Sequence, residues 1–98
     1  MITLQKRPPE IRNYTFDFSL FPEMVNGDTI NSVLAVVGTI IQGTGGIPTQ
    51  SAPGFTNTTV FLTLTGGSAN IIVQYSCKVT TAGGATLEML GNLRLLTT

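Results

Sequence analysis

The stretch Ile71-Ile72-Val73-Gln74-Tyr75-Ser76-Cys77-Lys78-Val79-Thr80 decides the fold class of this 98-residue chain. From residue 71 its apolar side chains fall on the odd positions, and from residue 74 polar side chains fill the even ones. That period of two is typical of a strand with one buried face. Thr65-Gly66-Gly67-Ser68 before it and Thr81-Ala82-Gly83-Gly84 after it are turn sequences. We therefore expect a strand over residues 71–80 with a turn at each end.

Working outward, the same period recurs over residues 13–19, 55–64 and 87–95, and residues 29–38 are apolar on both parities. No segment keeps a period of 3.6 residues, although residues 22–24 suit a single helical turn. Evenly spaced strands and turns predict an all-β domain, a sandwich or a small barrel. The expected core consists of Tyr14, Phe16, Phe18, Ile30, Val60, Leu62, Ile71, Val73, Tyr75, Cys77, Leu87 and Leu93.

Two segments do not fit a strand. Pro8-Pro9 favours an extended path without hydrogen bonds of its own, so residues 1–12 are expected to form an extended N-terminal arm, followed by a single domain over residues 13–98. Simple terminal disorder is the alternative for the arm. Residues 43–54 are rich in Gly, Pro, Ser and Thr and are expected to form a long loop, which in a compact domain tends to be functional or disordered.

Charge is scarce and unevenly placed. Five Lys and Arg balance five Asp and Glu, and half of these ten residues lie in the first seventeen positions, whereas residues 29–77 carry none. Without a basic footprint, nucleic acid and anionic membrane are not expected as partners, and the longest apolar run, residues 33–41, is too short to span a bilayer. The uncharged stretch indicates either a permanent assembly or a wet, Thr-coated sheet face.

The residues offer little for catalysis. Without histidine there is no common general base, and Cys77 alone makes neither a disulfide nor a zinc site. The five carboxylates are scattered, and Asp28 suits a turn. Lys6 and Lys78 are expected to be solvated. We expect no catalytic residue, no metal site and no cofactor. A core role is favoured for the strand aromatics as a group, Phe55 and Phe61 among them, and Phe21 is the best candidate for an exposed aromatic residue.

Several short motifs resemble a known group. They are Pro8-Pro9-Glu10, Tyr14-Thr15-Phe16-Asp17-Phe18-Ser19, Gly27-Asp28-Thr29-Ile30, and the run from Gly66-Gly67-Ser68 to Thr81-Ala82-Gly83-Gly84. Together they resemble small structural proteins of tailed bacteriophages, the fibre-tail adaptor, neck or head-associated type. The resemblance implies an immunoglobulin-like antiparallel β-sandwich of about six to seven strands. Phe18 stands where that group usually has Trp, and the loop at residues 43–54 is longer than expected.

The resemblance implies a non-enzymatic virion structural protein, an adaptor that docks on the head-tail neck or tail and connects other virion proteins such as fibres. Its partners would be portal or neck, tail, fibre or capsid proteins, in a homo-oligomeric arrangement, and it would be made in the host cytoplasm. Two alternatives remain, a capsid decoration or cement protein and a host-surface carbohydrate-binding module. The residues expected to contact partners are Ile2, Leu4, Pro8, Pro9, Phe21, Gly45, Ile47, Pro48 and Pro53.

Overall fold

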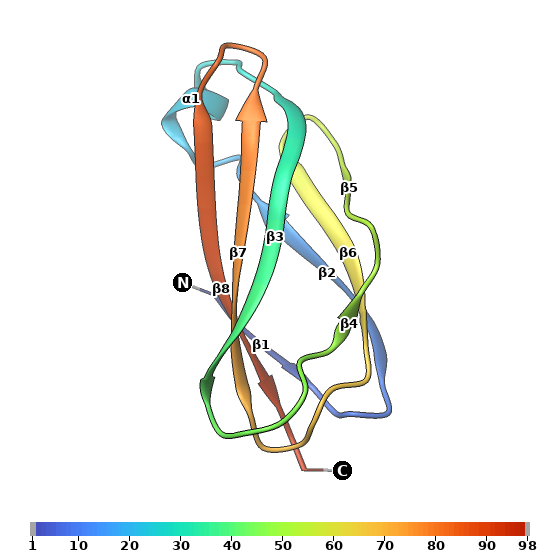
Figure 1. Ribbon diagram of the computed structural model, residues 1–98. Helices are drawn as coiled ribbons and strands as arrows, with labels where there is room; N and C mark the ends of the chain where they lie inside the picture. The colour runs from blue at the N-terminus through green and yellow to red at the C-terminus, as the bar shows by residue number, and fades with distance from the viewer. Residues whose placement is uncertain (1, 98) are drawn as a thin grey trace.

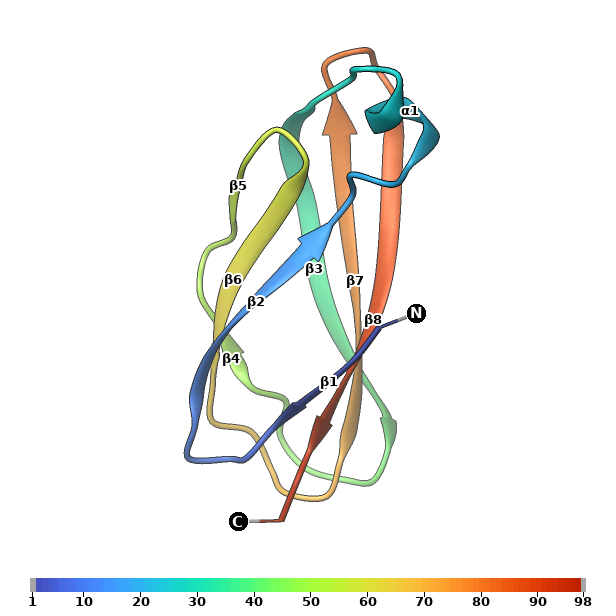
Figure 2. The same cartoon turned by 180° about the vertical axis from the view of Figure 1, so that it is seen from behind.

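The computed structural model describes residues 2–97 of the chain, with side chains from residue 5 onward. Its backbone forms two layers of strands that pack face to face (Figures 1 and 2). The strands are β1 (Ile2–Lys6), β2 (Ile11–Asp17), β3 (Ile30–Gln42), β4 (Thr49–Gln50), β5 (Gly54–Phe55), β6 (Thr59–Thr65), β7 (Ile72–Thr81) and β8 (Thr86–Leu95), and the one short helix is α1 (Pro22–Val25).

The first sheet has the order β1-β8-β7-β3, and the second has the order β2-β6-β4, with β5 also paired to β6. The molecule is elongated, with principal extents of 43 × 20 × 17 Å. These two sheets confirm the prediction of an all-β, sandwich-like fold, while the immunoglobulin-like topology stays a prediction. The described residues form eight strands rather than six or seven, because the three short strands β1, β4 and β5 were not expected.

The core lies between the sheets and follows the alternation in the sequence. On β7 the inward positions Val73, Tyr75, Cys77 and Val79 are at most 4% exposed, and the residues between them face outward. On β2, Tyr14 and Phe16 are buried in the same way. The structure buries all twelve residues expected in the core, and it adds residues such as Leu64 and Leu95. Inward residues of both sheets therefore meet in one apolar layer.

The N-terminal segment differs from the expected arm. Residues 2–6 form β1, which pairs with β8 in the register Ile2 to Gly91 through Lys6 to Leu95. This pairing is parallel, so the sheet is mixed rather than purely antiparallel. Residues 11 and 12, also assigned to the arm, open β2. Pro8 and Pro9 form a turn instead of the expected extended path, and the strand before them belongs to the same sandwich (Figure 2).

The expected long loop at residues 43–54 also differs. It carries β4 and β5, each two residues long, and both pair with β6. Pro53 lies between them and limits each to a short ladder, because proline has no N–H to donate. The Gln50 side chain donates a hydrogen bond of 2.8 Å to the Val36 carbonyl on β3. This contact joins the edges of the two sheets on one side of the sandwich.

Candidate docking surfaces

Loops gather at the two ends of the long axis. One end, here the α1 end, carries α1 and the turn between β7 and β8 (Figure 1). The other, here the Lys6 end, carries the β1–β2 turn, the β3–β4 loop and the β6–β7 turn (Figure 2). These ends hold the candidate contact residues that are discussed below.

At the α1 end, some apolar side chains of residues 18–25 are buried in the core and others are exposed to solvent. Phe18 and Met24 are buried, and Phe21 packs on Phe18 with ring centroids 5.2 Å apart. Leu20 and Val25 point away from this cluster and are 88% and 68% exposed. Phe21 was expected to be the exposed aromatic residue, but it is half-buried because its ring covers Phe18. The exposed apolar groups of this end are therefore aliphatic.

Asp28 fixes the geometry of the α1 end. Its Oδ1 accepts hydrogen bonds from the backbone N–H groups of Thr29 at 2.8 Å and of Gly83 at 3.0 Å. A hydrogen bond from Thr81 is the main reason why the pKa of Asp28 lies below its usual value. Asp28 therefore stabilises more than its own turn, because its carboxylate also binds the β7–β8 turn. The loop that follows α1 is held against that turn.

At the opposite end, Lys6 is fully buried. Its ammonium donates to three backbone carbonyls, those of Arg7 at 2.9 Å, Pro8 at 3.0 Å and Gly66 at 2.7 Å. Desolvation lowers the pKa of Lys6 from its usual value. The expectation that Lys6 is solvated is therefore wrong, because three carbonyls take the place of water. The lysine joins the end of β1 to the β6–β7 turn.

The β3–β4 loop packs on the same β6–β7 turn. Gly46 and Ser68 exchange two hydrogen bonds, from the Gly46 N–H to the Ser68 hydroxyl at 2.8 Å and from the Ser68 N–H to the Gly46 carbonyl at 2.9 Å. Gly67 has φ +98°, and a Cβ there would lie 2.9 Å from Pro48. Pro48 is therefore buried and is not an accessible contact residue, whereas Ile47 beside it is 43% exposed.

The structure brings together only some of the residues expected at an interface. Pro8, Pro9, Gly45, Ile47 and Pro48 share the Lys6 end, whereas Phe21 lies at the α1 end and Pro53 on a sheet edge. The backbone of Ile2 and Leu4 lies in β1, and their side chains are outside the described residues.

The sequence reasoning missed several exposed apolar residues near the ends, among them Leu20, Val25 and, beside the Lys6 end, Ile11 at 69% exposure. The alternation of β2 places Ile11 on the solvent face, which was a readable signal. The core role favoured for the strand aromatics as a group does not hold for Phe55 and Phe61, which are 44% and 46% exposed. The ring of Phe61 covers Gly54 on the outer face of the second sheet, where a Cβ would lie 2.5 Å from it.

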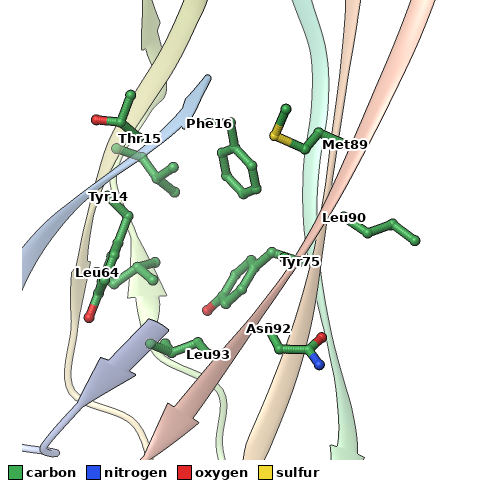
Figure 3. A pocket seen from close by; sticks show the side chains of 11 residues that line it. Tyr14, Thr15, Phe16, Leu64, Tyr75, Met89, Leu90, Asn92 and Leu93 are labelled. Atoms are coloured by element: carbon green, nitrogen blue, oxygen red, sulfur yellow. The ribbon is translucent and has the colours of Figure 1, made fainter. Parts of the chain in front are cut away.

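Reactive chemistry is sparse among the described residues. Cys77 is buried, and its burial raises the pKa of the thiol to about 12. No three residues of the His, Cys, Asp and Glu types gather in the described part of the chain. No described helix is long and apolar enough to cross a membrane. A small cavity between β2 and β8 is lined by apolar and aromatic side chains (Figure 3).

Comparison with known proteins places this architecture. No curated protein is significantly similar to the chain. A family model does match, over residues 6–94, and it is described as Gp77, podophage GP4 fiber-tail adaptor protein gp77. The match begins at the buried Lys6, the last residue of β1, and extends almost to the end of β8, so it covers the second sheet and most of the first. It confirms the resemblance found in the short motifs, and the chain belongs to this family of podophage fibre-tail adaptor proteins.

Proposed function

We propose that this virion structural protein is a passive spacer whose two loop-bearing ends bind different neighbours, the tail at one end and a fibre at the other. The observation that carries the proposal is the separation of exposed aliphatic residues. Leu20 and Val25 lie at the α1 end, and Ile11 and Ile47 lie at or beside the Lys6 end of a molecule 43 Å long. The proposed role is non-enzymatic, and it places the protein in the particle after synthesis in the host cytoplasm.

Contacts of this kind supply affinity without charge. Burying one exposed Leu or Val side chain against a partner contributes roughly 1.5–3 kcal/mol. Both ends are braced, by Asp28 at one and Lys6 at the other, so little conformational entropy is lost on docking. Several copies arranged around a tail would add their contacts and form a stable ring from modest single interfaces.

The test uses a phage that lacks the gene and is complemented with variants. Leu20→Ser with Val25→Ser alters the α1 end, and Ile11→Ser with Ile47→Ser alters the other end. Val37→Ser is the matched control, because Val37 is 55% exposed on the middle of β3 and far from both ends. Mass spectrometry of purified particles would measure the copies of the adaptor and of the fibre protein.

We expect the two double variants to fail in different ways. One should lose the adaptor and the fibre together, since it no longer binds the tail. The other should keep the adaptor and lose only the fibre. The control should retain both proteins. Particles with normal amounts of both proteins for either double variant would contradict the proposal that each end binds a partner.

A further inference from the structure

Strand β1 is connected to the rest of its own chain by a short turn. Arg7, Pro8, Pro9 and Glu10 form this turn, which the Glu10 N–H closes with a hydrogen bond of 3.0 Å to the Arg7 carbonyl. The Arg7 N–H donates in return to the Glu10 carboxylate at 2.7 Å. On the far side of the turn the chain enters β2, which belongs to the other sheet. The turn is therefore a hinge between β1 and the remainder of the domain.

Pro9 is poorly suited to the closed form of this hinge. It occupies the third position of the four-residue turn, after Pro8 at the second. Proline is favoured at the second position of a turn but not at the third, because it drives the residue before it toward an extended conformation. The two prolines together therefore favour an open, extended connection between β1 and β2 over the closed turn.

The groups that hold β1 in place are present in every copy of the chain. The Lys6 ammonium donates to the Gly66 carbonyl at 2.7 Å, and the Gln5 carbonyl accepts from the Tyr14 hydroxyl at 2.9 Å. The ladder with residues 91–95 of β8 adds the main-chain hydrogen bonds. All of these partners lie beyond the hinge. The β1 strand of a second copy would meet the same partners, so an exchange of strands between copies loses none of these contacts.

The length of the open hinge restricts such an exchange to an adjacent copy. The five residue steps from Lys6 to Ile11 span about 17 Å when the chain is fully extended. The molecule measures 20 Å and 17 Å along its two short axes. The hinge lies at the Lys6 end, just beyond β1 (Figure 2). β1 can therefore reach a copy that packs side by side with its own, and no copy farther away.

We propose that adjacent copies of this chain on the particle exchange β1, so that each copy completes its first sheet with the β1 strand of a neighbour. The partner is a second copy because it carries the segment that β8 already binds in a defined register. Exchange would tie the copies together without charged contacts, and the particle would bring the copies close enough for it to occur. This inference rests on the proposed function, which places several copies around one tail.

Paired cysteines test which chain supplies β1. Gln5 and Arg94 are exposed register partners on β1 and β8, so Gln5→Cys with Arg94→Cys places two thiols side by side. Asn13→Cys with Thr63→Cys is the matched control, because these register partners lie on β2 and β6, on the same side of the hinge. Particles that carry either double variant are oxidised, denatured without reductant and separated by gel electrophoresis.

Exchange predicts products of two or more chains for the β1–β8 pair and single chains for the control pair. Single chains for both pairs overturn this inference and leave the proposed function intact. Equal amounts of multi-chain products for the two pairs also overturn it, because lateral contact between copies would then explain the cross-links. Wild-type particles that lack the chain contradict the proposed function, and this inference falls with it.

A hinge variant tests the role of the two prolines on the purified chain. The β1–β8 cysteine variant is refolded at high concentration and oxidised, and its multi-chain fraction is measured. Pro9→Asn should lower that fraction about fivefold, because it frees Pro8 from the restriction and asparagine is a common turn residue. Pro53→Asn should leave the fraction unchanged, since Pro53 lies between β4 and β5 and outside the hinge. Equal fractions with and without Pro9→Asn overturn the role of the hinge.

Discussion

At the residue scale, burial was predictable where the residue type and the strand parity agree. Tyr75 and Cys77 are apolar residues on the inward parity of β7, and both are buried. Lys6 shows the limit of this reasoning. Nothing local predicts its burial, because one of its carbonyl partners, Gly66, lies sixty residues away in the sequence. That partner exists only once both sheets have formed, so residue type alone suggested a solvated lysine.

Lys6→Ala should therefore destabilise the fold strongly. The substitution removes three charge-assisted hydrogen bonds and leaves the Gly66 carbonyl without its partner. We expect a loss of about 3 kcal/mol in the free energy of unfolding, measured by urea denaturation. Lys78→Ala is the matched control, since the Lys78 side chain is 52% exposed and its nitrogen lies 4.0 Å from Glu88. Lys78→Ala should change the free energy of unfolding by less than about 1 kcal/mol. Similar losses for both variants would contradict the role of Lys6 in joining β1 to the β6–β7 turn.

At the element scale, the long strands were predicted and the edges were not. β2, β6, β7 and β8 each show an alternation that is visible in the sequence. β1 has only five residues, and its partner is at the far end of the chain, so its pairing is non-local. β4 and β5 are set by their partner β6 rather than by their own residues, because Gly and Pro dominate that segment.

Deletion of residues 2–6 tests whether this segment is a strand of the sandwich or a separate arm. An arm could be removed without loss of stability. Removing β1 takes away the parallel ladder and Lys6, so we expect a loss larger than the ~3 kcal/mol of Lys6→Ala alone, seen as a shift of the urea midpoint. A synthetic peptide of residues 1–8, added in trans, should restore part of the loss. An unchanged midpoint would restore the arm hypothesis.

At the scale of the whole molecule, the period of the strands was enough to predict an all-β fold. The docking surfaces could not be predicted in the same way. Ile11, Leu20, Val25 and Ile47 lie in different segments, and the sandwich topology alone decides at which end each residue appears. Residue patterns reveal which side chains face out along a strand, but the gathering of separate turns at one end is a property of the assembled fold.

The balance of ionisable groups predicts how the stability of the whole molecule depends on pH. Hydrogen bonds from Arg12 and the Arg7 N–H lower the pKa of Glu10 to about 2. The pKa values of Asp17 and Asp28 are also lowered, mainly by hydrogen bonds from Ser19 and Thr81. A carboxylate whose pKa is lower in the folded state stabilises the fold above its unfolded pKa. That stabilisation is lost as the pH falls through the folded value.

The melting temperature should therefore stay level from about pH 5 to 8 and fall between about pH 4 and 2. On the alkaline side, burial raises the pKa of Cys77 to about 12, so the unfolded thiol ionises first and stability declines above about pH 8.5. Lys6, with its lowered pKa, acts in the opposite direction there. Calorimetry across this range should show a shallower acid limb for Glu10→Gln and a shallower alkaline limb for Cys77→Ala. If Glu10→Gln keeps the wild-type acid slope, the ion pair with Arg12 does not hold the β1–β2 turn in solution, and the acid limb must come from Asp17 and Asp28.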